Sequence, residues 1–476
     1  MTAAMPTRWF RSVVAQFSTA LLCIPGFLMT SMVSAADAPS AERTIRLYAA
    51  AAQTTGAARL WKREDWLAIE GEATATWMVT IDRGGAYRAT IVYSGDTPGT
   101  PFTLALGSTV ANGELAVQTE VFKDPLMNFG RTIANESARL PRGSLRVQLR
   151  IPGGKAQLRI RSIEIEPAAA ALTAGQERKI AQERANTDWL AHAAYGVMFH
   201  WTSESTPRHG QALPYQRAVD AFNVAAFAEM VASTGAKYVI FTVNHAQPHC
   251  PAPIKSWERF HPGSTTKRDL LAEIAKALEA RNVRLMLYFA SHTVGKLRVA
   301  TGPEYLRIHK EILQEFGQRY GTQVAGYWFD GWYQTLEAYP EINPRDLLPY
   351  VRAGNPARLV AFNSWVYPIE TPWQDYWAGE VAEIVRPAMS RYAASGAAIG
   401  LQSHFLLFAD APWVHSLPDA EMEPLRFSDE SLIDFVKKNA EKEAAVTINL
   451  GIYQDGSIGQ AARRQMAALR QAIRGE

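Results

Sequence analysis

The chain has 476 residues, of which 47% are hydrophobic, 10% aromatic and 20% charged. At roughly 150 residues per domain it should hold two or three domains, and its apolar share excludes a disordered chain, a coiled coil and a collagen-like fibre. With 49 Lys and Arg against 46 Asp and Glu, the formal charge is only +3. That balance gives no electrostatic reason to expect nucleic acid or an anionic membrane as a partner.

The first residues, 1–36, differ from this average. Two arginines precede a largely apolar run at 13–33, and small residues follow at 34–36. This order is typical of a secretory signal peptide, so we expect cleavage and export to the periplasm or the cell exterior. A permanent membrane anchor is the alternative, and Pro25 and Gly26 within the run disfavour it. No membrane contact is expected after cleavage.

Residues 40–167 alternate apolar and polar side chains in short runs, which glycine- and proline-rich turns separate. This pattern predicts an antiparallel β-sandwich. The expected strands lie at 75–81, 87–93, 102–106, 145–151 and 157–165. The segment contains no histidine, which excludes a histidine-based active site from it. It resembles the small carbohydrate-binding modules of secreted glycosidases, in particular from Gly85 to Gly95 and in the closing strands up to Pro167; a packing domain that binds nothing is the alternative.

A linker and helix are expected at 168–188, and the pattern then changes. From 189 to 476, short apolar runs alternate with amphipathic segments, which predicts an α/β fold. The number of such units fits a (β/α)₈ barrel of the TIM type, which would follow the N-terminal sandwich. The expected strands are 195–201, 237–245, 284–292, 324–330, 358–365, 398–407 and 445–450, and the expected helices 224–234, 269–281, 304–320, 430–443 and 460–473.

Active sites of such barrels lie at the carboxyl ends of the strands, so the polar and tryptophan residues that end the apolar runs are the candidates. All ten histidines and nine of the thirteen tryptophans lie at or beyond Trp189. Tryptophans combined with carboxylates suit a sugar, which stacks its C–H face on aromatic rings and hydrogen-bonds through its hydroxyls. The strand-end candidates are His200, Trp201, Asn244, His245, Ser291, His292, Asp330, Asn363, Trp365 and His404.

Asp330 is the most informative of these residues. It ends an apolar strand in Gly326-Tyr-Trp-Phe-Asp-Gly331, beside Trp328. A carboxylate there can attack an anomeric carbon if a second carboxyl group about 5–5.5 Å away serves as acid and base. A turn or helix-capping role is the alternative. Spacing alone does not choose the partner among Glu370, Asp375, Glu380 and Glu383.

Several motifs together resemble a known family. They are Tyr195-Gly-Val-Met-Phe-His-Trp201, Gly235-Ala-Lys-Tyr238, Arg268-Asp-Leu270, Tyr327-Trp-Phe-Asp-Gly331, Asp375-Tyr-Trp-Ala-Gly-Glu380, and Ile448-Asn-Leu-Gly451 with Asp455-Gly456. In this order they resemble the α-L-fucosidases of glycoside hydrolase family 29, from Ala194 to the C-terminus. The resemblance implies a retaining exo-glycosidase with Asp330 as nucleophile and Glu380 as acid/base, acting on an oligosaccharide or glycoconjugate without metal or organic cofactor.

By resemblance, His200, Trp201 and His245 match family positions that hold sugar hydroxyls. Asn363 begins the stretch that usually contacts the sugar next, and the chain also shows departures. The substrate-binding candidates are His200, Trp201, Asn244, His245, Trp328, Asn363 and Trp365. Family members usually carry two histidines and Asp-Gly where this chain has Asn244-His-Ala-Gln247, and Asn-Asp-Arg where it has Asn363-Ser-Trp365. They also carry a sandwich after the barrel rather than before it. The expected sugar is therefore L-fucose or a related L-sugar.

Two other functions compete with this interpretation. A metal-dependent hydrolase would use histidines and a carboxylate at the barrel mouth, which are ligand types suited to zinc. Its candidate ligands are His200, His245, His249, His292, His404 and Asp330. A barrel that binds carbohydrate without turnover is the other alternative, and the presence of both Asp330 and Glu380 argues against it.

Overall fold

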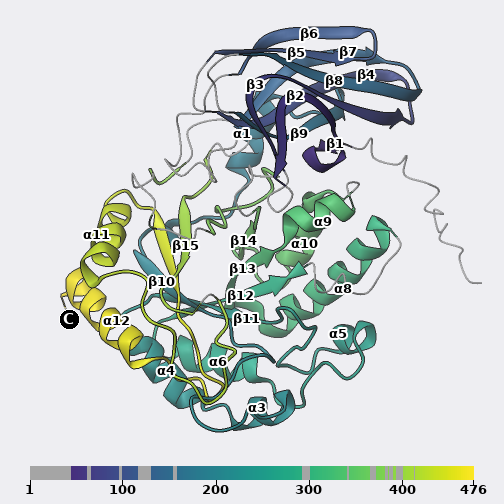
Figure 1. Ribbon diagram of the computed structural model, residues 1–476. Helices are drawn as coiled ribbons and strands as arrows, with labels where there is room; N and C mark the ends of the chain where they lie inside the picture. Colours follow the sequence, from purple (N-terminus) through teal and green to yellow (C-terminus); the bar gives the residue numbers. More distant parts are fainter. Residues whose placement is uncertain are drawn as a thin grey trace, which may run out of the picture. The chain divides into compact units, whose positions relative to one another are not determined.

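The computed structural model describes residues 44–475, apart from 62–65, 96–98, 116–129, 154–157, 292–300, 340–341, 365–370, 381–383, 385–389, 393–399 and 412. The expected signal peptide lies outside this described part. Figure 1 shows the described chain as an antiparallel sheet followed by a region of parallel strands and helices. No helix within the described part is both long and apolar enough to cross a membrane.

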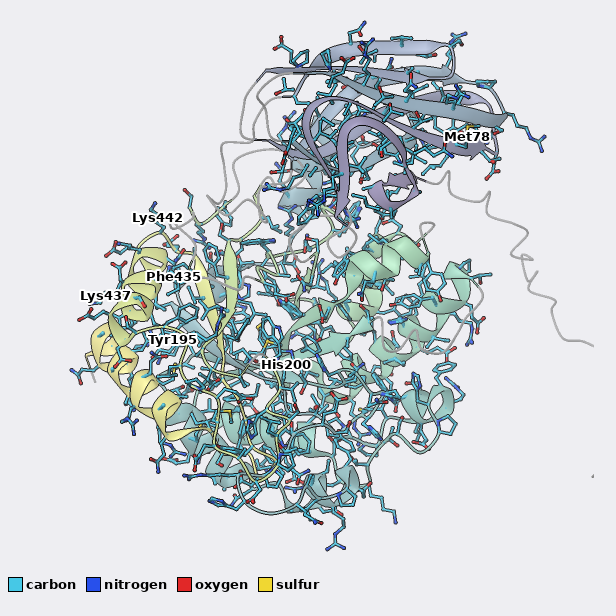
Figure 2. The ribbon with its side chains drawn as sticks, viewed as in Figure 1. Met78, Tyr195, His200, Phe435, Lys437 and Lys442 are labelled. Atoms are coloured by element: carbon cyan, nitrogen blue, oxygen red, sulfur yellow. The ribbon has the colours of Figure 1, made fainter. Side chains whose placement is uncertain are left out.

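The first sheet is antiparallel. Its described strands follow the order β6-β5-β8-β3-β9-β4-β7, with β1 beside β9 and β2 beside β3. The strands are β1 (Ile45–Tyr48), β2 (Gln53–Trp61), β3 (Trp66–Ile81), β4 (Gly85–Gly95), β5 (Thr100–Leu106), β6 (Thr109–Leu115), β7 (Gly130–Leu140), β8 (Gly143–Pro152) and β9 (Leu158–Pro167). Alternate side chains such as Trp77, Val79 and Ile81 fill its core, while Met78 between them is exposed (Figure 2).

The sequence pattern located five of these strands and missed four. The strands that it missed are β1, β2, β6 and β7. Only two residues of β6 are buried, and most of β7 is half-buried or exposed. A strand with so few buried positions shows little hydrophobic alternation, which is the signal that sequence analysis depends on.

The second sheet is parallel throughout, in the order β14-β13-β12-β11-β10-β16-β15. Its strands are β10 (Tyr195–Phe199), β11 (Tyr238–Thr242), β12 (Arg284–Ala290), β13 (Val324–Asp330), β14 (Leu359–Phe362), β15 (His404–Phe408) and β16 (Ala445–Asn449). Every predicted strand of this region is present, usually shorter at one end. Because the strands run in one direction, their carboxyl ends meet at one edge of the curled sheet.

Helices connect these strands. They are α1 (Ala174–Gln182), α2 (Asp188–Ala191), α3 (Tyr215–Ala221), α4 (Val224–Ser233), α5 (Lys255–Phe260), α6 (Leu270–Glu279), α8 (Gly302–Tyr320), α9 (Trp332–Ala338), α10 (Leu348–Val351), α11 (Asp429–Ala440) and α12 (Gln460–Arg474). The five predicted helices match α4, α6, α8, α11 and α12. The unpredicted α3, α5, α9 and α10 have seven residues or fewer, too short to show a clear helical period.

Side-chain caps start most of the longer helices. Asn223, Asp269, Thr301 and Ser428 each accept a hydrogen bond from a backbone N–H of the following turn. Such a cap satisfies one of the N–H groups that a helix start leaves without an intrahelical partner. The first residues of these helices in the structure therefore lie close to those that the sequence pattern predicts.

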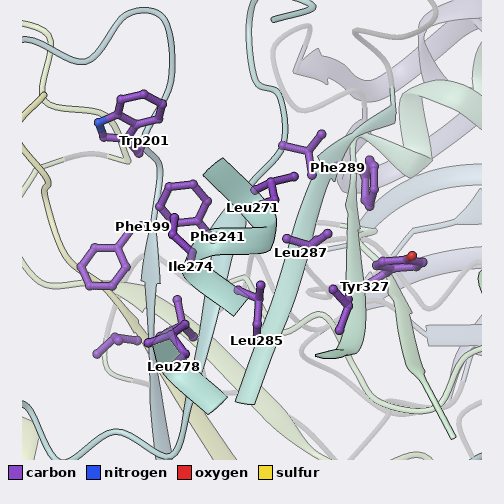
Figure 3. Close-up of a cluster of buried hydrophobic side chains, with 14 of the residues drawn as sticks. Phe199, Trp201, Phe241, Leu271, Ile274, Leu278, Leu285, Leu287, Phe289 and Tyr327 are labelled. Atoms are coloured by element: carbon purple, nitrogen blue, oxygen red, sulfur yellow. The ribbon is translucent and has the colours of Figure 1, made fainter. Parts of the chain in front are cut away.

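Two apolar layers hold the parallel sheet. Leu271, Ile274 and Leu278 of α6 pack against Phe241 and Leu285 of the adjacent strands (Figure 3). On the other face of the strands, a separate cluster includes Met198, Ile240, Met286, Trp328 and Leu406. Alternate strand residues therefore face two different cores, and Trp328 of the second core precedes Asp330 by two residues on β13.

One irregular segment lies between β14 and β15. The backbone N–H of Asp375 donates to Val360 of β14 at 2.9 Å, and that of Leu406 in β15 donates to Gly379 at 2.7 Å. Isolated parallel bridges pair Tyr376 with Gln402 and Glu380 with Leu406. Residues 375–380 therefore contact a strand on each side, and Glu380 lies at the carboxyl end of this segment.

Arg358, just before β14, should be a strong determinant of stability. The side chain is fully buried, its Nη1 donates to Val351 and Ala353 at 2.7 and 2.8 Å, and its Nε donates to Val324 at 3.0 Å. We expect Arg358→Met to lower the free energy of unfolding by about 3 kcal/mol or more, because buried carbonyls lose their donors.

Urea denaturation followed by circular dichroism measures this effect. Arg464→Met is the matched control, since Arg464 is exposed on α12 (Gln460–Arg474), and a surface change of this kind should shift stability by no more than about 0.5 kcal/mol. Equal unfolding midpoints for the two variants would contradict the role assigned to Arg358.

Candidate active site

Asp330 is the last residue of β13 and is held by three donors. Its Oδ2 accepts a hydrogen bond from the Tyr288 hydroxyl at 2.5 Å. Its Oδ1 accepts from the backbone N–H of Gly331 at 2.7 Å and from Nδ2 of Asn363 at 2.9 Å. Gly331 turns the chain away at a φ of 65°, a conformation that glycine adopts without strain. The carboxylate is thus fixed at the sheet edge in a defined orientation.

Asn363 joins Asp330 to the second carboxyl group. Its Nδ2 also donates to Oε2 of Glu380, at 2.5 Å. Oδ1 of Asp330 and Oε2 of Glu380 therefore lie no farther apart than the sum of the two hydrogen bonds that Asn363 makes. The structure brings together three residues that the sequence analysis named separately, from β13, from the end of β14 and from segment 375–380.

The environment of Glu380 favours its neutral form. Burial and the negative charge of Asp330 raise the pKa of Glu380 to about 8, and the hydrogen bond from Asn363 opposes the rise. Burial also raises the pKa of Tyr288 well above its usual value, and the adjacent Asp330 adds to that rise. Tyr288 is therefore a neutral hydrogen-bond donor to Asp330.

Aromatic side chains surround this pair. Tyr288 stacks on Trp328 at a centroid distance of 5.3 Å, and the register pairs these two residues on adjacent strands. The Trp328 indole donates to the carbonyl of Ala378 at 3.0 Å. Trp328 is almost fully buried, so it supports Tyr288 and the segment that carries Glu380.

His200 lies in the same environment, at the end of β10 (Figure 2). Its ring is 4.9 Å from that of Tyr288 and 5.3 Å from that of His245. Burial and the nearby His245 lower the pKa of His200 to about 3. Its neutral ring donates from Nδ1 to Oδ1 of Asn449 at 2.7 Å, which leaves Nε2 as an acceptor. A neutral acceptor of this kind suits a sugar hydroxyl.

Three residues near the site were not singled out by the sequence analysis. They are Tyr288, Asn449 and Trp413. Tyr288 lies inside an apolar strand, where the pattern indicates core. Asn449 is part of a family-like motif and also donates from Nδ2 to the carbonyl of Trp413 at 3.2 Å. The Trp413 ring is 5.3 Å from that of His200, although it follows a different strand, so no local signal relates the two.

Two predicted sugar-binding residues have other roles. Trp201 is 1% exposed, donates from its indole to the carbonyl of Gln454 at 3.0 Å, and packs against Phe222 in the outer core. The amide of Asn244 bonds at both ends to the backbone of Ala290, at 3.0 and 3.1 Å. Both side chains are engaged within the protein, and their expected contact with substrate stays a prediction.

Among the other candidate partners of Asp330, only Asp375 lies within the described residues. Asp375 is buried, where it accepts bonds from the backbone N–H of Ala185 and Val360 and forms an ion pair with Arg352 at 2.8 Å. It thus holds the backbone rather than facing Asp330. Trp365, Glu370 and Glu383 lie outside the described residues.

The candidate metal ligands do not all lie together: the rings of His200 and His245 are adjacent, whereas other candidates are placed elsewhere. His404 contacts the carbonyl of Ala378 through Nδ1 and Thr447 through Nε2, and His249 lies against Tyr215. His292 lies outside the described residues. Within the described part of the chain, no group of three or more His, Cys, Asp or Glu side chains is arranged to hold a metal ion.

Comparisons with known proteins agree with the chemistry of this site. Residues 214–380 match the family model of α-L-fucosidase. The tissue α-L-fucosidase of Bos taurus is 26% identical, over 37% of this chain and 46% of that enzyme. The chain therefore spans about half the length of this curated relative.

Two solved structures are similar at low sequence identity. An α-L-fucosidase of family 29 from Bacteroides thetaiotaomicron, trapped as a covalent intermediate, has a TM-score of 0.46 and 16% identity, over 62% of this chain and 74% of that one. An endo-fucoidan hydrolase of family 107 has a TM-score of 0.47 and 14% identity, over 60% and 93%.

The parallel sheet and its carboxylate edge thus lie in the part of the chain that is similar to glycoside hydrolases. The match to the α-L-fucosidase family model over residues 214–380 supports the resemblance to glycoside hydrolase family 29. This stretch runs through β13 and β14 and includes Asp330, Asn363 and Glu380.

Proposed function

We propose that the protein is a retaining exo-glycosidase that releases α-linked L-fucose, or a related L-sugar, from glycans. The observation that carries this proposal is the bridge from Asn363 Nδ2 to Asp330 at 2.9 Å and to Glu380 at 2.5 Å. It holds one oxygen of each carboxyl group within the sum of these two distances, which favours the roughly 5–5.5 Å separation of retaining glycosidases over the roughly 6.5–9.5 Å of inverting enzymes.

In the first step, Asp330 attacks the anomeric carbon while the bond from that carbon to the leaving oxygen breaks. Glu380, whose pKa is raised to about 8, is protonated at neutral pH and gives its proton to the leaving oxygen. The product is a glycosyl ester of Asp330 and a free aglycone.

In the second step, water attacks the same carbon and the ester bond breaks. Ester formation has removed the negative charge of Asp330, one cause of the high pKa of Glu380. That pKa therefore falls, and Glu380 accepts the proton of the attacking water. The sugar leaves with its original anomeric configuration, and both carboxyl groups return to their first states.

The strand arrangement supports a complete barrel as part of this proposal. Residues 375–380 hydrogen-bond to β14 on one side and to β15 on the other. We infer that this segment takes the place of an eighth strand and closes the sheet, so that Asp330 and Glu380 face each other across the barrel mouth. Export after loss of residues 1–36, and carbohydrate binding by the antiparallel sheet, stay predictions.

Hydrolysis of aryl glycosides tests the proposed function. The protein that begins at residue 37 is assayed with 4-nitrophenyl α-L-fucoside beside the aryl glycosides of other L- and D-sugars. We expect cleavage of the fucoside, with retained configuration when the first product is followed by NMR. Turnover of a different sugar alone would overturn the substrate, and an inverted first product would overturn the mechanism.

A further inference from the structure

We propose that Asn363 is a positioning residue that sets the spacing of the two carboxyl groups and keeps their ionisation separate. The proposal rests on the proposed function, because it assigns Asp330 and Glu380 as the reacting groups. It gives the side chain a role other than binding a sugar hydroxyl.

The location of Asn363 fits this role. It follows β14 directly, is 1% exposed, and its backbone N–H donates to Phe329 of β13 at 2.7 Å. That bond fixes its backbone beside the strand end that carries Asp330. The side-chain nitrogen has two hydrogens, and the structure gives it two carboxylate acceptors, at 2.9 and 2.5 Å. Each hydrogen therefore serves one carboxyl group.

Two carboxyl groups this close would otherwise share one proton. When they do, the pKa of one group rises strongly and the pair titrates as a unit. An amide nitrogen between them cannot accept a proton, so it prevents a direct hydrogen bond from one carboxyl group to the other along this path. Asp330 then remains available as a nucleophile while Glu380 keeps the proton.

The groups around Glu380 change its pKa in opposite directions. Asp330 raises the pKa of Glu380, and the hydrogen bond from Asn363 lowers it. Tyr288, which also interacts electrostatically with Glu380, is neutral because its pKa is raised well above the usual value. Once the charge of Asp330 is lost in the ester, the bond from Asn363 remains and favours the ionised Glu380 that the second step requires.

Asn363→Ala and the isosteric Asn363→Asp test the proposal in the full chain without its first 36 residues. Asn355→Ala is the matched control. Asn355 is a buried asparagine near the opposite end of β14, and it bonds only to the backbone of Val324 and Ala357. The measurements are kcat, KM and the pH profile of kcat/KM on an aryl fucoside with a poor leaving group.

For both Asn363 variants we expect kcat to fall by about 10²-fold, the scale of one acid–base contribution. The alkaline limb of kcat/KM should move to higher pH, because the bond that favours ionised Glu380 is lost. Asn355→Ala should lower the urea concentration at the unfolding midpoint, and the alkaline limb of its kcat/KM profile should stay at the pH found for the parent protein. An unmoved limb in Asn363→Ala would overturn the proposal, because a merely structural role would lower activity without shifting the limb. A shift in Asn363→Asp alone would overturn it too, because the added carboxylate raises the pKa of Glu380 whatever role Asn363 has.

A second readout is independent of turnover. The carboxyl carbons of glutamate are labelled with ¹³C, Glu380 is assigned from Glu380→Gln, and its titration is followed by NMR. A higher midpoint in Asn363→Asp and Asn363→Ala than in the parent protein supports the proposal, and an equal midpoint overturns it. Absence of fucoside hydrolysis by the parent protein would contradict the proposed function alone, and this titration would still decide the role of Asn363.

Discussion

Asp330→Asn is expected to lower kcat on aryl α-L-fucosides by at least about 10⁴-fold, the scale seen when a nucleophile is removed. The variant should fold, because an asparagine oxygen can still accept from Gly331 and Asn363, and its amide can donate to the Tyr288 hydroxyl. The loss would therefore report chemistry. Initial-rate kinetics, with circular dichroism as the folding check, measure it.

The smaller Asp330→Gly variant makes the test more specific. With the nucleophile removed, azide should attack the α-fucoside directly and give the β-fucosyl azide, by one inversion. Asp346→Asn is the matched control, since Asp346 lies in the 3₁₀ helix Pro344–Leu347 before β14, and it should keep parental activity. Parental turnover by Asp330→Asn would contradict the nucleophile assignment.

Glu380→Ala is expected to slow the hydrolysis of poor leaving groups by about 10²–10⁴-fold, the usual contribution of general acid catalysis. Fucosides with a good leaving group, such as 2,4-dinitrophenolate, should be affected far less in the first step, because that group departs without a proton. Azide should then intercept the glycosyl-enzyme and give the α-fucosyl azide, by two inversions. The two azide anomers thus separate the roles of Asp330 and Glu380.

The pH dependence provides a further check on Glu380. An acid must be protonated to act, and the pKa of this group is raised to about 8. The kcat/KM of the parent enzyme on a poor leaving group should therefore hold up to about pH 8 and fall above it. Glu380→Ala should lose this alkaline limb. If it keeps both the limb and parental rates, the acid role passes to Glu370 or Glu383.

Much of the parallel region was predictable because its signals are local. Each strand there is a short apolar run that ends in a polar residue, and Asp330 with Gly331 stands out for that reason. The longer helices carry a clear apolar period and a side-chain cap at the start. The antiparallel sheet was predicted less completely, because β6 and β7 bury few side chains and show little alternation.

The side-chain roles at the strand ends were harder to predict. His200 and Trp201 are neighbours in sequence, yet His200 lies beside Tyr288 while Trp201 packs into the outer core against Phe222. Asn244 ends a strand as a binding residue would, but its amide holds the backbone of Ala290. Once the strand ends, the alternation of side chains no longer indicates which face a residue occupies.

The sequence by itself determined that this protein has an apolar parallel-strand region, a strand-end carboxylate at Asp330 and the motifs of a glycoside hydrolase. These features depend on neighbouring residues and on short patterns. The family resemblance also indicated Glu380, but only the tertiary structure showed that Asn363 links it to Asp330 and that Tyr288 donates to the same carboxylate. Asn363 is 33 residues from Asp330 and 17 from Glu380. Their contact exists only because parallel strands bring their carboxyl ends to one edge.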